Sequence, residues 1–234
     1  MTKSIFSLEK FAAYRSHCKQ EGYCMPFVPY VGDEYGKTGA IKFVYCGGAA
    51  WWSEPDTVID DDAEAHAYSS DESRKFVLSD MYGSAFWSFF RELAAIVPGL
   101  AGEQDETMLK RFVWTNITKT GLVGENAPPN DPNLRPLDVA QVRHELDVLL
   151  PDLIVCVSGS LVTSTAYEIF DTPEWKAGES FEARTGSTWI RQAPWGGWLL
   201  WTMHPAYKTR EWRDSVLADV KAVIERIIVV QTSP

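Results

Sequence analysis

Four short apolar segments mark the predicted strands of this chain. They are Ile41–Cys46, Phe112–Ile117, Leu153–Ser158 and Trp198–Met203. Three of them are nearly continuous in apolar residues, without the alternation of a strand that has one face in water. Such runs are typical of parallel strands that helices cover on both faces, so we expect a buried parallel sheet.

Helical patterns lie between these strands. Ser84–Val97 carries apolar residues at helical spacing, and a Pro-Gly pair ends it. A second pattern begins near Pro136 and runs to Leu150, and a third covers Trp212–Val229. Strands that alternate with helices predict an α/β sandwich around a small parallel sheet.

One acidic segment, Glu54–Asp71, has neither helical nor strand periodicity. We interpret it as a solvated loop. A carboxylate cluster that binds a metal ion is the alternative, since Asp60, Asp61 and Asp62 are adjacent. Three consecutive side chains face one ion only in an unusual turn, so we expect no metal site here.

The composition fits one domain, residues 1–234, with a substantial core, because 45% of the residues are apolar and 23% are charged. The longest apolar runs fall far short of the ~20 residues that a membrane helix needs, and the N-terminus has no signal-peptide pattern. Four cysteines are too few for a disulfide scaffold, and their spacing matches no zinc pattern. We therefore expect a reducing, cytoplasmic setting and no membrane partner.

The charge balance argues against a surface that wraps nucleic acid non-specifically. The 32 acidic residues outnumber the 22 basic ones, which gives a net charge of −10. Non-specific binding depends on Lys and Arg that neutralise phosphates. A local groove with positive charge is compatible with this negative net charge.

Ligands of parallel α/β sheets bind at the carboxyl ends of the strands, which singles out four loops. The first loop is Gly47–Trp52, which contains Gly48, Ala49 and Trp51, and the second is Asn116–Gly121, which contains Thr118 and Lys119. The third is Gly159–Ser160, and the fourth is His204–Lys208, which contains Tyr207. They bring small residues, an amide, an imidazole and several aromatic side chains to one edge. We expect the functional site there.

His204 and Asn116 are the residues with the most useful chemistry in these loops. A neutral imidazole at His204 can donate one hydrogen bond to a developing negative charge, and Pro205 fixes the chain direction after it. The amide of Asn116 carries donors and an acceptor, which suits it to one edge of a planar base. The alternatives are a histidine that only satisfies nearby backbone groups and an asparagine that caps a turn.

The remaining loop residues carry weaker signals. Gly47 and Gly48 allow close approach of a ligand to the backbone, but the chain has no phosphate-binding glycine motif. Trp51 and Trp52 could stack on a base, although filling the core is the commoner role of a tryptophan. Ser158-Gly159-Ser160 does not have the glycine frame of a nucleophile elbow.

Three stretches resemble motifs of the uracil-DNA glycosylase superfamily. IKFVYCGG resembles its first-motif strand, and LLWTMHPAYKTR resembles its closing HP motif. TNITKTG, followed by PPN and by a helix that ends in LLPDLIVCVSG, resembles the block between them. Together these stretches span most of the chain from Ile41 to Ile224. The resemblance implies a four-stranded parallel sheet between helices, in a three-layer α/β/α sandwich.

The resemblance also implies an activity and residue roles. Enzymes of this family flip a base out of DNA and hydrolyse its N-glycosidic bond. Asn116 matches the residue that hydrogen-bonds the base, and His204 matches the histidine that stabilises the departing uracil anion. Tyr207 and Lys208 match the loop that enters the minor groove. DNA with a deaminated base is therefore an expected partner.

The chain also departs from the family pattern. Gly48 and Ala49 stand where the first motif usually has an Asp, Glu or Asn that positions water, and Glu34, Glu54 or Asp56 are the possible substitutes. The cysteines of the iron–sulfur branch are missing, so we expect no iron–sulfur cluster. A non-catalytic protein that binds a nucleobase or nucleotide in the same pocket is the alternative function, and an interaction domain with a relict pocket is a third.

Overall fold

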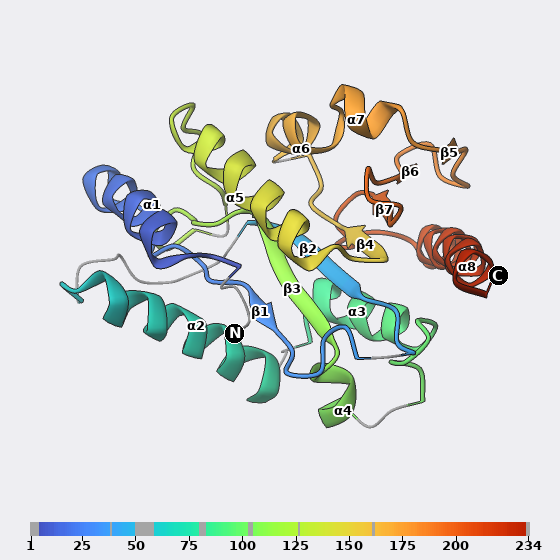
Figure 1. Ribbon diagram of the computed structural model, residues 1–234. Coiled ribbons are helices and arrows are strands. Elements are labelled where there is room, and N and C mark those ends of the chain that lie inside the picture. The colour runs from blue at the N-terminus through green and yellow to red at the C-terminus, as the bar shows by residue number, and fades with distance from the viewer. Residues whose placement is uncertain are drawn as a thin grey trace.

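A computed structural model describes residues 5–37, 39–49, 59–79, 83–102, 105–125, 127–160 and 162–232. Its strands are β1 (Tyr30–Val31), β2 (Phe43–Ala49), β3 (Phe112–Thr118), β4 (Leu153–Cys156), β5 (Ser180–Phe181), β6 (Trp189–Gln192) and β7 (Trp198–Trp201). They form one mixed sheet of seven strands in the order β1-β3-β2-β4-β7-β6-β5 (Figure 1). The predicted α/β class is confirmed.

The sheet is larger than the four parallel strands that we expected. The four predicted strands correspond to β3, β2, β4 and β7, which pair in parallel at the centre. β1, β6 and β5 add antiparallel edges, so the prediction of a purely parallel sheet is wrong. These edge strands have only two to four residues, which is too short for an apolar pattern to reveal them.

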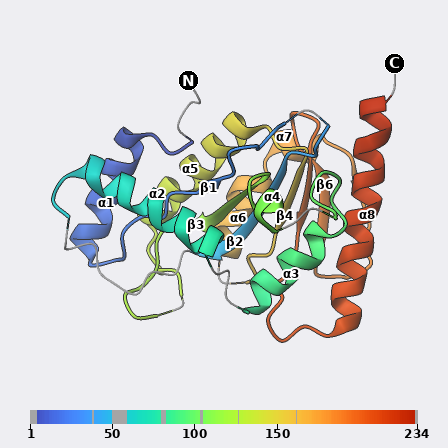
Figure 2. The same ribbon diagram turned by 90° about the horizontal axis from the view of Figure 1, so that it is seen from below.

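Helices cover both faces of the sheet. They are α1 (Leu8–Glu21), α2 (Asp62–Ser79), α3 (Ala85–Ala94), α4 (Asp105–Leu109), α5 (Leu134–Leu149), α6 (Thr163–Phe170), α7 (Pro173–Lys176) and α8 (Arg210–Thr232). Phe43 and Tyr45 of β2 pack with α3 and α8, whereas Val44 and Cys46 pack with α5 and α6. Figure 2 shows α8 at the end of the molecule opposite α1 and α2.

The acidic segment that we interpreted as a loop is helical from Asp62 onward, as part of α2. Its acids stabilise the helix start, because the side chain of Asp61 accepts a hydrogen bond from the backbone N–H of Glu64 at 2.9 Å. The inner face of α2 consists of small residues such as Ser69 and Ser73, whose hydroxyls bind the backbone of residues 26–28. Two of the four buried positions described for α2, which are Ala65, Ser69, Ser73 and Val77, are serines, so the apolar period is interrupted and the helix is missed.

No helix in the described ranges combines the length and the apolar character that crossing a membrane requires.

Candidate functional site

A cavity of about 900 Å³ opens at the carboxyl ends of the parallel strands. Strand-end residues that line it are Gly47, Gly48, Ala49, Asn116, Gly159 and His204. Its apolar wall comes from Phe27, Phe76, Phe86, Trp87 and Trp114. The amide and the imidazole that we singled out from sequence therefore line one cavity, as the strand-end rule predicts.

The carboxamide of Asn116 lies directly over Gly47. The two residues are paired in register between β3 and β2. A Cβ atom on Gly47 would lie 2.3 Å from Asn116 Oδ1, so the amide occupies space that only glycine leaves open. Asn116 is 2% exposed, and its Nδ2 has no hydrogen-bond partner among the described residues. A buried unpaired donor costs about 1–3 kcal/mol, and a ligand acceptor would recover that cost.

His204 is held in one neutral tautomer. Its Nδ1 accepts a hydrogen bond from the backbone N–H of Ala206 at 3.1 Å, which leaves the proton on Nε2. Burial lowers the pKa of His204 below its usual 6.5, so the ring is neutral at physiological pH. The geometry thus provides an Nε2–H donor without a positive charge.

Phe86 completes the centre of the site, and the sequence analysis assigned it only to a helix. Its ring stacks on the His204 ring with centroids 6.1 Å apart and planes 15° from parallel. The hydroxyl of Tyr45 donates a hydrogen bond to the Phe86 carbonyl at 2.8 Å, which fixes the start of α3. The Phe86 ring also approaches the Cα of Gly47, because a Cβ there would meet its edge at 3.2 Å. Phe86 and Asn116 therefore line the same part of the cavity, beside Gly47.

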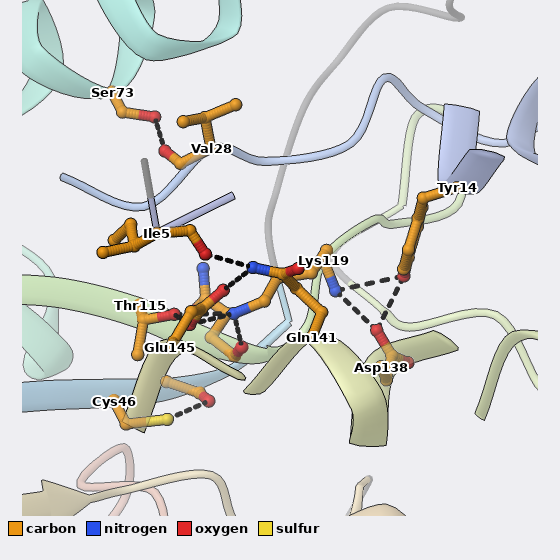
Figure 3. A network of polar contacts seen from close by, with 12 residues as sticks. Ile5, Tyr14, Val28, Cys46, Ser73, Thr115, Lys119, Asp138, Gln141 and Glu145 are labelled. Atoms are coloured by element: carbon orange, nitrogen blue, oxygen red, sulfur yellow. Dashed lines mark hydrogen bonds and ion pairs between the residues drawn. The ribbon is translucent and has the colours of Figure 1, made fainter. Parts of the chain in front are cut away.

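Lys119 and Thr118 lie outside the cavity, so the expectation that they contact a ligand there does not fit the geometry. Lys119 is fully buried, and its Nζ binds Glu145 Oε2 at 2.9 Å (Figure 3). The same ammonium donates to the Asn116 carbonyl at 2.6 Å. Lys119 therefore supports the strand that carries Asn116 instead of touching the cavity.

Thr118 lines a separate polar pocket of about 110 Å³ together with Asp138. Burial raises the pKa of Asp138 to about 7, although Tyr14 Oη and the Lys119 backbone N–H donate to this carboxyl at 2.7 and 3.0 Å. We find no arrangement of at least three His, Cys, Asp or Glu side chains that fits a metal ion in the parts of the chain that the structure describes.

The rim of the cavity contains an unusual residue. Tyr207 has a left-handed backbone with φ of 58°, and its side chain is fully exposed. Such a conformation is uncommon for a bulky residue and costs stability. Lys208 follows it, with Nζ 5.8 Å from the centroid of the Trp212 ring. An aromatic side chain and a cation thus project beside the opening, where the sequence predicts a nucleic-acid contact.

The carboxylate that lines the cavity among the described residues is Glu72, which the sequence analysis missed because it comes from α2. Its Oε1 accepts a hydrogen bond from Lys75 Nζ at 2.8 Å. Glu34 binds Arg111 and does not line the cavity. The predicted candidates Trp51, Trp52, Glu54 and Asp56 lie outside the described residues.

No protein-family model matches this chain, and no curated protein matches it either.

Proposed function

We propose that this protein is a divergent member of the uracil-DNA glycosylase superfamily that binds a flipped, deaminated base and hydrolyses its N-glycosidic bond. One observation carries the proposal: the unpaired amide of Asn116 and the Nε2–H of His204 line the same cavity at the strand ends. The four parallel strands at the centre of the sheet and the order of the sequence motifs support a glycosylase-like sandwich.

The proposed chemistry follows from these donors. Asn116 Nδ2 donates to a base carbonyl, and its Oδ1 accepts from the adjacent ring N–H, which selects an imide or lactam edge. The bond between the base nitrogen and C1′ breaks with its electron pair going to the base. His204 Nε2–H donates to the carbonyl oxygen on which the negative charge develops. Water then adds to C1′ and loses a proton to solvent, and the base anion takes up a proton from solvent and leaves as the neutral base.

A carboxylate that orients the water is the missing part of this scheme. Glu72 is the candidate within the described residues, because it lines the cavity. Its Oε1 lies 2.8 Å from Lys75 Nζ, and a carboxylate beside the sugar would stabilise the positive charge that develops there. Glu72 approaches from α2 and not from the end of β2, so it replaces the usual first-motif acid from a different element.

A uracil-release assay on single- and double-stranded DNA tests the proposal. We expect free uracil, and we expect Asn116→Ala and His204→Ala each to lower the rate about 10²-fold, since each removes a hydrogen bond to the developing charge or to the base. Gly186→Ala is the matched control, because a Cβ at Gly186 would meet no atom within 4 Å. If stoichiometric protein releases no uracil from either substrate, the catalytic proposal is wrong.

Binding without catalysis is the second candidate function. The net charge of −10 favours it, because a negative surface does not help a protein to bind the phosphates of DNA. A nucleobase- or nucleotide-binding protein would keep the Asn116 and His204 donors and release no base. Calorimetric titration with free bases and nucleotides distinguishes the two functions: binding without release supports this candidate, and release of uracil contradicts it.

A further inference from the structure

The imidazole of His204 packs against an aromatic ring from a distant part of the chain. Phe86 stands in the first turn of α3, whereas His204 follows β7. Their rings lie 15° from parallel, with centroids 6.1 Å apart. Gly159 also approaches the histidine, because a Cβ atom on this glycine would lie 3.3 Å from His204 Cβ. The side chain of His204 is therefore packed against α3 and against the loop after β4.

Tyr45 of β2 holds Phe86 in its place. Tyr45 is fully buried, and its hydroxyl donates a hydrogen bond to the Phe86 carbonyl at 2.8 Å. The rings of the two residues are 4.4 Å apart between centroids. The same turn of α3 is capped by Ser84, whose hydroxyl accepts a hydrogen bond from the backbone N–H of Trp87 at 3.3 Å. A central strand and a helix cap together fix the ring that packs on the histidine.

This packing has two consequences for the imidazole. The backbone N–H of Ala206 binds Nδ1, and the Phe86 ring restricts rotation of the imidazole plane, so the direction of Nε2–H is limited. Phe86 also contributes to the burial that lowers the pKa of His204. Charged side chains that line the same cavity are Glu72, Lys75 and Lys208.

We propose that Phe86 is a positioning residue for His204, and that Tyr45 acts on the same imidazole through Phe86. The catalytic part of this inference rests on the proposed function, because it requires His204 Nε2–H to donate to the base. Stabilisation of a developing charge depends on donors that are already oriented toward it. A misplacement of about 1 Å can lower a rate about 10²-fold. Tyr45 and Phe86 thus affect the rate through the histidine.

Two tyrosine variants test the role of the Tyr45 hydroxyl. Tyr45→Phe keeps the ring and removes the hydrogen bond to Phe86. Tyr30→Phe is the matched control, because the Tyr30 hydroxyl is also buried and donates to a backbone carbonyl, that of Leu109, at 2.7 Å. In uracil-release assays, we expect kcat to fall about fivefold in Tyr45→Phe, with KM unchanged within about twofold. Neither constant is expected to change in Tyr30→Phe. Equal effects of the two variants, or a change in KM alone, contradict the inference.

Phe86→Leu in two backgrounds tests whether Phe86 acts through His204. In the wild-type background, kcat is expected to fall about tenfold. In the His204→Ala background, the same substitution is expected to change the rate at most about twofold, because residues that act as a unit are not additive. An equal loss in both backgrounds would show that Phe86 acts on the base or on the fold, and would overturn the inference. Thermal-unfolding midpoints show whether each variant folds, and the tyrosine pair provides the result if Phe86→Leu does not.

An NMR titration of the four histidines separates this inference from the proposed function, because it needs no substrate. The signal that is missing in His204→Gln identifies His204. We expect its pKa to lie below 6.5 and to rise toward 6.5 in Phe86→Ala, where water reaches the ring. An unchanged pKa in folded Phe86→Ala overturns the inference, whereas release of uracil still supports the proposed function. If the wild-type chain releases no uracil, the proposed function and the catalytic part of the inference are both wrong, and the titration shows whether Phe86 packs on the imidazole.

Discussion

At the scale of single residues, Gly47 is the position in the site with the least space for a side chain. Its φ lies outside the left-handed range, so backbone freedom does not require glycine here. The requirement is steric, because the Asn116 carboxamide fills the place of a side chain. The orientation of the amide thus depends on a residue of the neighbouring strand that has no chemistry of its own.

Gly47→Ala is expected to weaken ligand binding. The added Cβ would lie 2.3 Å from Asn116 Oδ1, so the amide must turn away from its present orientation. We expect affinity for a base to fall at least about tenfold, which is the value of one lost hydrogen bond. Calorimetric titration measures this, with Gly186→Ala as the control. Wild-type affinity in Gly47→Ala would show that the observed amide orientation is not the binding one.

His204 leads to a pH prediction. The proposed chemistry needs the neutral ring, in which Nε2 carries the proton and unprotonated Nδ1 accepts the hydrogen bond from the Ala206 backbone N–H. Because burial lowers the pKa below 6.5, base release is expected to stay constant from pH 8 down through 6.5 and to fall only at more acidic pH. The rate measured across this range tests it. His204→Gln, which keeps a donor but does not titrate, should lack the acidic fall, and a fall that begins above pH 6.5 would contradict the assignment.

At the scale of elements, the buried network between β3 and α5 holds Asn116 in place. Lys119 Nζ binds Glu145, Thr115 Oγ1 at 2.6 Å and the Asn116 carbonyl. Gln141 Nε2 donates to the other oxygen of Glu145 at 2.8 Å (Figure 3). Each oxygen of this buried carboxylate has a donor, so the pair is tolerated in the core.

Lys119→Met is expected to lower the free energy of unfolding by about 3–5 kcal/mol, because it leaves the Glu145 carboxylate buried without its cation. The double variant Lys119→Met/Glu145→Leu removes both charges and should recover most of that loss. Denaturant unfolding of the two variants measures the difference. Equal stability of the single variant and the wild-type chain would mean that the ion pair does not support the end of β3.

At the scale of the whole molecule, the strong negative charge limits how DNA can bind. Lys75 and Lys208 are the basic residues that line the cavity in the described ranges, and Lys75 is paired with Glu72. Under the proposed function, recognition is therefore expected to depend on the flipped base and on few phosphates. This agrees with a site in which hydrogen-bond donors outnumber cations.

A salt titration tests this interpretation. Binding of uracil-containing single-stranded DNA is expected to show a slope of log K against log salt of about −1 to −2, which corresponds to one to three phosphate contacts. Lys208→Gln should make the slope shallower by about one contact, whereas Lys37→Gln, a control that does not line the cavity, should not change it. A slope as steep as that of a strongly basic DNA-binding protein would contradict this account.

Much of the fold was predictable because the core strands carry strong local signals. The segment of β4 is apolar at every position, and both of its faces are covered in the structure. α3, α5 and α8 were predicted within a few residues, since helical spacing and helix-ending residues are local properties. α2 was missed because serine hydroxyls on its buried face bind backbone groups that only the fold brings near.

The sequence by itself determined which residues stand at the carboxyl ends of the parallel strands, because runs of apolar residues and the loops after them are encoded locally. Only the tertiary structure decided which of those residues face the cavity. The alternation of side chains along β3 directs Asn116 and Trp114 to one face, and Lys119, the residue after β3, forms the ion pair with Glu145. The packing of α2 and α3 added Glu72 and Phe86, since contacts between elements distant in the chain depend on three-dimensional packing that no local pattern specifies.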